Sequence, residues 1–588
     1  MNTRKTYIGI IAGLGLMAAG CTSMDITPKD QGNSASWYST EVELQLAVNE
    51  FYILGYWNRP LESSEQWTDN TTYRQQNRAA GSGGSVLDGT MTGSMWEVYS
   101  LWQQDYKLIS RANTLLENIH RAEENGVNPA AIKRFKAEAY FARACKYAEL
   151  LFFFGDLPYM DKYMTISEAE AIGRKPKDEI IPLVYDDFDE AIDGLPVSWG
   201  AEHAHPTKGA AMAMKARFAL YMGDWEIAAK AAKDCMDLNV YSLASDYGSV
   251  FLQSTGVIPE KVFAIPRSIE NSVTLDEWFV KNGLPRNAGG YGSYNPSWDL
   301  LAAYLCTDGL PIDESPLFNP QKPFENRDPR CTATIVEFGT EHVGFIYDPS
   351  PAATKVLNTK TGAMQSNNDS RAVAQYASFN GLVWRKGIDQ SWVDNFPKVA
   401  PDYIIMRYAD VLLMYAEAKI ELNEIDDTVL DAMNQVRARA YKAAVTATSD
   451  YPAITETAQD KLRTILRIER RMEFAFENLR LYDIWRWRIA EKVLNRPWIG
   501  LPKKDEKLQR AYIDNNMWFH GAVPEIDEDG CMDFMAPVAK GAADFFNSNA
   551  YAQVLAECKF VAPKSYLWPL PTTTMQVMKN IKENNPGY

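Results

Sequence analysis

The chain has 588 residues, of which 46% are hydrophobic and 12% aromatic, so it can bury a large core and does not have the composition of a disordered polymer. Its net charge of −16 and pI near 5.0 argue against a nucleic-acid partner, because binding to phosphate backbones needs a basic surface. The cysteines include no C-x-x-C pair, a pattern that predicts neither a disulfide scaffold nor a zinc site.

The N-terminus has the pattern of an export signal. A cationic start precedes the short apolar run "YIGIIAGLGLMAAG", which is too short to span a bilayer, so residues 1–20 are predicted to be a signal peptide. The run continues into Cys21, and "AAGC" resembles the bacterial lipobox, in which the cysteine becomes the acylated N-terminus. We therefore expect the mature protein, residues 21–588, to be held at a membrane by lipid at Cys21.

Helical periodicity is the strongest pattern in the rest of the chain. Apolar residues recur every three or four positions in several long segments, which predicts amphipathic helices that are packed as hairpins. In "FALYMGDWEIAAKAAKD", a Gly-Asp turn joins two alanine-rich helices, as in a tetratricopeptide unit. The predicted helical segments are residues 94–119, 132–160, 179–196, 209–239, 407–440 and 461–487.

Two long stretches lack this periodicity. Residues 51–95 and about 240–402 are rich in Gly, Pro, Asn and aromatic side chains, and they predict loops and short strands. Irregular segments of this length in a compact chain usually carry function. The predicted organisation is a mainly α scaffold over about 35–240 and 402–588, with a loop-rich insert between these parts.

The chain resembles the SusD/RagB family of outer-membrane lipoproteins. The motifs that carry the resemblance include "FKAEAYFARACKYAELLFFFGDLPYM", "ENRDPRCTATI", "RYADVLLMYAEAKIELNE" and "RIERRMEFAFENLRLYDIWRW", in the order typical of that family. Residues 206–232 and the ending at 567–588 also match. One departure is Asn478, where glycine is usual, and we expect Asn478 to adopt the left-handed conformation that closes a helix.

The resemblance implies a tetratricopeptide-like scaffold that lies at the cell surface and presents nutrient, usually a glycan, to a SusC-like TonB-dependent transporter. It implies no catalysis and no cofactor. Two alternative functions stay open. The first is binding of a peptide-derived nutrient for the same kind of transporter complex, and the second is a hydrolase. The family motifs do not identify the ligand, because they lie outside the ligand loops.

Loop aromatics beside polar side chains are the candidate glycan-binding residues. A sugar ring has an apolar C–H face that can lie on an aromatic ring, and its hydroxyls need amide or charged partners. The candidates are Trp57, Asn58, Trp67, Asp69, Asn70, Tyr73, Arg74, Tyr291 and Tyr294. The tryptophans that fall on helical periods or in family motifs are instead predicted to be core residues, and these are Trp96, Trp102, Trp225, Trp485 and Trp487.

Other polar groupings are predicted to be structural. His203 and His205 have no third metal ligand nearby and are expected to be solvated loop residues. The carboxylates of "YDDFDEAID" are expected on a solvated helix face rather than at a glycosidase centre. The charges of residues 467–480 alternate in sign along one helix and predict ion pairs. The chain contains neither G-x-S-x-G nor H-E-x-x-H, which leaves the hydrolase without a catalytic motif.

Overall fold

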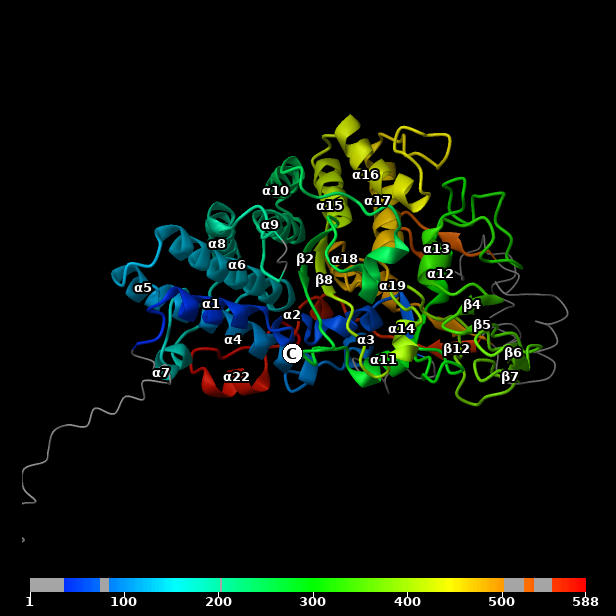
Figure 1. The fold of residues 1–588 in the computed structure, drawn as a ribbon, viewed down its shortest axis with the longest axis horizontal. Coiled ribbons are helices and arrows are strands. Elements are labelled where there is room, and N and C mark those ends of the chain that lie inside the picture. Colours follow the sequence, from blue (N-terminus) through cyan, green and yellow to red (C-terminus); the bar gives the residue numbers. More distant parts are fainter. Residues whose placement is uncertain (1–35, 74–83, 201–203, 502–522, 534–552) are drawn as a thin grey trace, which may run out of the picture.

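The computed structural model describes residues 36–73, 84–200, 204–501, 523–533 and 553–588. Helices dominate these ranges and the strands are short, so the prediction of a mainly α fold is confirmed (Figure 1). Cys21, Arg74 and His203 lie outside the described residues. Within the described ranges, no helix is both long and apolar enough to cross a bilayer.

The N-terminal half is built from long helices that pack one after another. Helix α4 contacts α6, α6 contacts α8, α8 contacts α9, and α9 contacts α10. Helix α1 packs against α6. The bounds are α1 Glu41–Asn49, α4 Trp96–Asn118, α5 His120–Glu124, α6 Pro129–Phe154, α7 Ile166–Glu170, α8 Lys177–Gly194, α9 Lys208–Met222 and α10 Trp225–Asp237.

The turn between α9 and α10 forms at the predicted position. Gly223 ends α9 with φ 85°, a left-handed conformation that glycine adopts at little cost. Ala216, Ala219, Ala228 and Ala232 are fully buried, because small side chains let the two helix backbones approach closely. This pair is therefore a tetratricopeptide-like hairpin.

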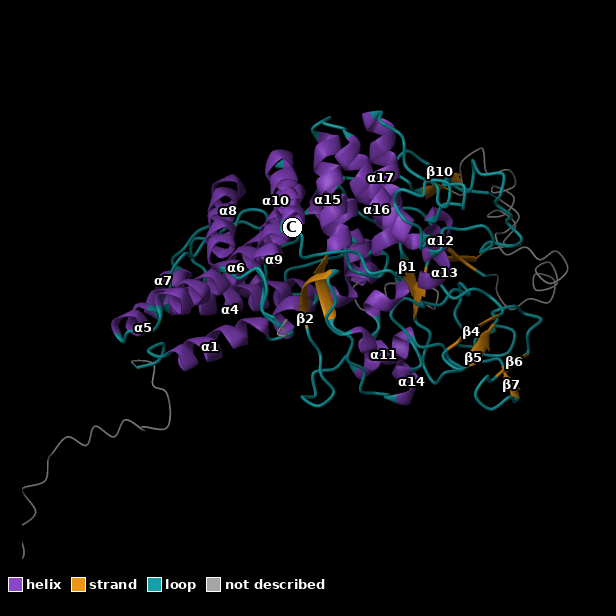
Figure 2. Cartoon of the chain, turned by 45° about the horizontal axis from the view of Figure 1, so that its top comes forward, coloured by secondary structure: helices purple, strands orange, loops and turns teal. Residues whose placement is uncertain are grey.

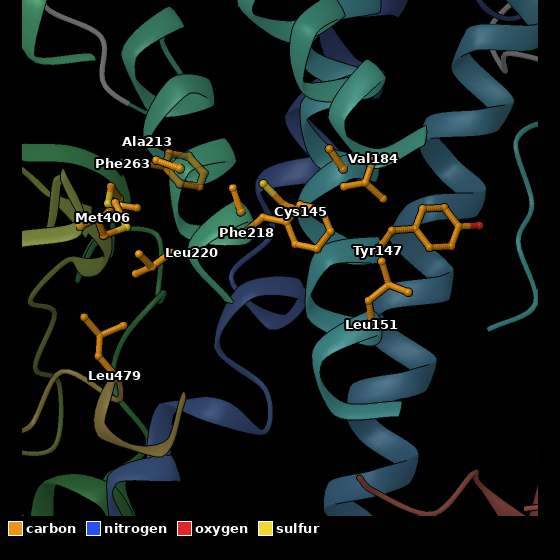
Figure 3. Packing of buried hydrophobic residues seen from close by; sticks show 14 of the residues in the cluster. Cys145, Tyr147, Leu151, Val184, Ala213, Phe218, Leu220, Phe263, Met406 and Leu479 are labelled. Carbon is orange, nitrogen blue, oxygen red and sulfur yellow. The ribbon is translucent and has the colours of Figure 1, made fainter. Parts of the chain in front are cut away.

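Figure 3 shows how the core of this half is filled. Tyr147 and Leu151 of α6 lie near Val184 of α8, while Phe218 of α9 extends toward Cys145. All of these side chains are buried. These side chains belong to one hydrophobic core that joins the predicted helices.

The C-terminal half repeats this packing. Helix α15 contacts α10, α16 and α17, and in this way joins the two halves (Figure 1). The bounds are α15 Tyr408–Glu421, α16 Asp427–Ala440, α17 Gln459–Phe474, α18 Arg480–Arg486, α19 Ala490–Leu494 and α22 Thr572–Val577. As predicted, Asn478 lies in the left-handed region, with φ 63°. It does not close α17, which already ends at Phe474, and the single helix predicted over 461–487 is divided into α17 and α18.

The loop-rich regions contain short helices and six two-stranded antiparallel sheets among the described residues (Figure 2). The short helices are α2 Gly55–Asn58, α3 Gly84–Asp88, α11 Glu277–Gly283, α12 Trp298–Ala303, α13 Arg330–Thr334 and α14 Ser391–Asp394. The paired strands are β1 Thr71–Tyr73 with β3 Tyr294–Pro296, β2 Lys261–Ile265 with β8 Tyr403–Arg407, β4 Thr340–His342 with β5 Phe345–Tyr347, β6 Lys355–Leu357 with β7 Met364–Ser366, β9 Trp498–Gly500 with β12 Gln553–Ala556, and β10 Glu525–Ile526 with β11 Met532–Asp533.

Two of these sheets organise the insert. The β2–β8 sheet holds the two ends of the insert together, immediately before α15 begins. The β1–β3 sheet joins residues 71–73 of the first irregular segment to residues 294–296 of the second. Both loop-rich regions therefore meet at one place.

Several predictions about individual side chains need correction. Trp96, predicted to be core, is the first residue of α4 and is 58% exposed, whereas Trp102 and Trp485 are buried as predicted. His205 is buried, and its Nδ1 lies 2.7 Å from Glu138 Oε2. Asp187 is buried as well, and it accepts hydrogen bonds from Arg143 at 2.6 and 2.7 Å.

Candidate functional site

The β1–β3 sheet brings together the tyrosines predicted from the two loop regions. Tyr73 lies directly opposite Tyr294 in the register, and Tyr291 precedes β3 by three residues. Tyr294 is buried, whereas Tyr73 and Tyr291 are half-buried. The pairing explains why these residues from distant segments share one region.

An exposed group of aromatic rings lies beside Tyr291. Trp278 on α11 is 58% exposed, and its ring meets that of Tyr291 edge to face, with a centroid distance of 5.2 Å. Phe396 follows α14, which lies next to α11 in Figure 1, and it is also exposed. Lys281 joins them, because its Nζ lies 5.8 Å from the Tyr291 ring centroid and 5.4 Å from that of Phe396. We call Trp278, Tyr291, Phe396 and Lys281 the aromatic patch.

Local structure holds the patch in place. The Asp276 carboxylate caps α11 by accepting hydrogen bonds from the backbone N–H groups of Trp278, at 2.8 Å, and Phe279, at 3.3 Å. Lys281 donates to Glu277 at 2.7 Å, one helical turn away. The capped helix α11 therefore holds Trp278 and Lys281, with Glu277 beside them, next to Tyr291.

Sequence reasoning missed Trp278 and Phe396. Both lie in the stretch of about 240–402 that the sequence predicts to form loops and short strands, where only Tyr291 and Tyr294 were singled out. The adjacent aromatics Trp278 and Phe279 were a weak signal, because neighbouring helical residues point in different directions. Phe279 turns inward, where its ring meets that of Tyr294 at a centroid distance of 5.6 Å.

The structure places the two predicted loop tryptophans in the core. Trp57 is 6% exposed, its Nε1 donates to the Phe51 carbonyl at 2.9 Å, and its ring meets Phe141 and Phe263 at 6.2 and 5.1 Å. Trp67 is 2% exposed and meets Trp568 edge to face at 5.8 Å. Both rings therefore pack in the core and are not available to stack on a sugar. The expectation that they bind a glycan needs correction.

The predicted polar partners are also used internally. Asp69 accepts hydrogen bonds from Arg480 at 2.8 and 2.9 Å and forms an ion pair with Arg471 at 2.9 Å. Burial opposes its ionisation, but the two guanidinium groups hold the pKa of Asp69 well below its usual range. The Asn70 amide donates to Glu65 at 2.7 Å and accepts from Arg471 at 2.9 Å. These contacts correct the expectation that Asp69 and Asn70 face a ligand.

Asn58 is the remaining predicted polar partner within the described residues. It is half-buried, and its Nδ2 donates to Glu62 Oε2 at 2.8 Å. It lies on α2, next to the buried Trp57. Asn58 is therefore part of the loop's own packing, at a distance in sequence from the aromatic patch.

The charges of α17 form ion pairs, as predicted, and the structure shows that these pairs are buried. Glu473 lies 2.6 Å from Arg407 and 2.9 Å from Arg330, and it also pairs with Arg439. Arg470 binds Asp410 at 2.9 Å. Burial opposes ionisation of Glu473, yet its three guanidinium partners hold its pKa well below the usual range. These charges anchor α17 to the insert and to α15 and α16 rather than binding an anion.

Potential metal ligands and thiols are not assembled into a centre within the described ranges. In the part of the chain that the structure describes, no group of three or more His, Cys, Asp and Glu side chains is placed to hold a metal ion. Five cysteines, Cys145, Cys235, Cys306, Cys331 and Cys531, are free, buried thiols. The exposed aromatic patch is therefore the strongest candidate for a functional surface.

Helical hairpins joined to long loop-rich segments make this a tetratricopeptide-like scaffold protein. The protein-family model described as "SusD family" matches residues 259–588, which is more than half of the chain. A second family model, described as "Starch-binding associating with outer membrane", matches residues 30–220. The chain belongs to the SusD family.

Individual relatives agree with this assignment. SusD-like protein P2 of Formosa agariphila is 27% identical over 492 residues, which cover 81% of this chain and 90% of the relative. A SusD-like protein of Bacteroides ovatus is 22% identical over 523 residues, 84% of each chain. The crystal structure of a SusD-like carbohydrate-binding protein from Bacteroides fragilis aligns with a TM-score of 0.74 at 26% identity, and it covers 93% of this chain and 99% of that one.

Proposed function

We propose that this protein is a surface lipoprotein that binds a glycan at the aromatic patch without cleaving it. The observation that carries the proposal is the group formed by the exposed Trp278 and Phe396 and the half-buried Tyr291, beside Lys281 and Glu277. Grouped exposed aromatic side chains mark interaction sites more often than a single exposed ring does, and a sugar can cover these rings while its hydroxyls reach the charged groups. The related carbohydrate-binding protein from Bacteroides fragilis supports this ligand class.

We further infer that the lipid at Cys21 anchors the protein to the outer membrane, where it passes the glycan to a SusC-like TonB-dependent transporter. Family membership and the lipobox-like "AAGC" support this inference. Weak, reversible capture suits a protein that must release its cargo. Co-purification of such a transporter in equal amount from gently solubilised membranes is the expected result, and isolation without a transporter would contradict it.

Calorimetry of the mature chain against host, plant and microbial glycans tests the binding proposal. Trp278→Ala should weaken binding about 2- to 13-fold, since one stacking contact contributes about 0.5–1.5 kcal/mol. Trp96→Ala is the matched control, because Trp96 is an equally exposed tryptophan, 58%, on α4 rather than on α11. The control should bind as the wild type does.

Three results would contradict the proposal. Equal losses from Trp278→Ala and Trp96→Ala would show that the patch is not the site. Sugar fragments released over time would indicate a hydrolase. Binding of peptides, with no response to any glycan, would favour the peptide-derived nutrient.

A further inference from the structure

A cavity of about 130 Å³ borders the aromatic patch on its inner side. Phe279, the residue after Trp278, and Tyr294 of β3 both line it. Trp384, Trp392 and Phe476 form its aromatic wall. A cavity of about 150 Å³ holds one benzene ring, so this smaller cavity can take one edge of a single sugar ring, with the rest of the ring outside it, and cannot take a chain.

The wall contains hydrogen-bond donors without acceptors. Trp384 and Trp392 are 8% and 2% exposed, and neither indole Nε1 has a partner among the described residues. The Nε of Arg267, another buried lining residue, is likewise unpartnered within the described ranges. Unpartnered buried donors also occur elsewhere in the described core, as at Trp485, but these three belong to residues that line one cavity, where a ligand that brings oxygen acceptors can satisfy them.

The ionic groups of the wall are paired with one another or with neighbours. Arg267 pairs with Glu62, and Lys386 donates to Glu477 at 2.5 Å. Asp402 is paired with Lys261 at 2.8 Å. Because both lining cations already hold carboxylates, the wall does not favour an anionic ligand. The chemistry that remains is that of a neutral molecule with many hydroxyl groups.

The backbone departs from regular structure to build this wall. Phe476 has φ 63°, which is rare for a bulky side chain, and its ring stacks on Trp384 with a centroid distance of 4.9 Å and an interplanar angle of 10°. Lys386 holds this turn by donating to the Ala475 carbonyl at 2.8 Å. Backbone strain of this kind is concentrated at binding sites, where the surrounding structure maintains it.

We propose that this cavity receives the uncharged terminal pyranose of the glycan, while the following sugar units lie on the aromatic patch. The indole N–H groups of Trp384 and Trp392 then donate to ring hydroxyl oxygens, and the stacked pair of Phe476 and Trp384 borders the sugar. This inference rests on the proposed function and deepens it, since it assigns recognition of a chain end rather than of an internal stretch.

The test uses the mature protein and free neutral pyranoses, namely glucose, galactose, mannose and xylose, together with oligosaccharides of the glycan that binds. At least one free pyranose should bind, and glucuronate should bind more weakly because of its charge. Trp384→Phe keeps an aromatic ring but removes the donor, and it should weaken pyranose binding about fivefold. Trp485→Phe is the control, because it removes an equally buried, unpartnered indole N–H from the helical core.

A second variant tests the cavity without changing a buried tryptophan. Ser63→Phe places a ring at a half-buried lining position and should abolish pyranose binding while the fold is kept. Trp278→Ala should weaken binding of oligosaccharides but not of the free pyranose. That contrast separates the cavity from the patch.

The outcomes distinguish the two proposals. If oligosaccharides bind through Trp278 while no pyranose binds and Ser63→Phe has no effect, the cavity inference is overturned and the proposed function stands. If a pyranose binds through Trp384 but no oligosaccharide depends on Trp278, the cavity stands as a sugar site and the patch proposal fails. Absence of binding by every sugar overturns both.

Discussion

The buried charge at Glu473 makes a strong stability prediction. Its carboxylate contacts Arg330, Arg407 and Arg439 and is fully buried. Glu473→Gln keeps the shape of the side chain but removes the negative charge that these guanidinium groups share. Breaking a buried ion pair by removing one partner costs about 3–5 kcal/mol, because charge is left uncompensated.

The surrounding contacts place the expected loss near the lower end of that range, about 3 kcal/mol. Arg330 keeps Asp328 at 2.8 Å, Arg407 keeps Glu477 at 2.6 Å, and Arg439 keeps Glu260 at 2.9 Å. Each guanidinium therefore retains at least one carboxylate. The effect should also depend on pH, since the folded-state pKa of Glu473 is depressed: its contribution is present above the unfolded value near 4.5 and is lost as pH falls below it.

Urea unfolding followed by circular dichroism measures this loss as a lower midpoint for Glu473→Gln at pH 7. Asp193→Asn is the matched control, because Asp193 makes an acid–lysine pair of 2.6 Å with Lys133 at the surface, where solvent screens it. The control midpoint should not move. Equal midpoints for Glu473→Gln and the wild type would refute the assignment of this network to stability.

Three further predictions concern the core, pH and the membrane anchor. Trp67→Ala should destabilise the fold by about 3–5 kcal/mol, as measured by denaturant titration, whereas a purely ligand-binding ring would leave stability unchanged. Burial lowers the pKa of His342 to about 3. As the pH falls below about 6.5, His342 therefore binds a proton in the unfolded state but stays neutral in the folded state. Stability should therefore decline by about 2 kcal/mol between pH 7 and 5, and His342→Gln should flatten this decline; an unchanged slope would contradict it. Cys21→Ala should release the protein from membranes in cells that lack the transporter, and continued membrane association there would exclude a lipid anchor.

Regular structure was accessible from the sequence because its causes are local. Apolar spacing predicted α4, α6, α9, α15 and α17, and the Gly-Asp dipeptide predicted the turn before α10. The alternating charges of α17 predicted ion pairs, although not that they would be buried. Most of the family motifs lie on this scaffold, which is why the resemblance was also visible in the sequence.

Which loop aromatics are exposed was decided only by the tertiary structure. Trp57 and Trp278 both stand among polar residues, yet Phe141 and Phe263 cover the first, whereas the second projects from α11 into solvent. The covering residues come from distant segments, so no local pattern records them. The same holds for the cavity, whose wall joins residues 279, 384, 392 and 476. The sequence by itself determined the helices and the family, because short-range periodicity and propensity produce them; the binding surface depends on long-range packing between loops, which only the folded chain establishes.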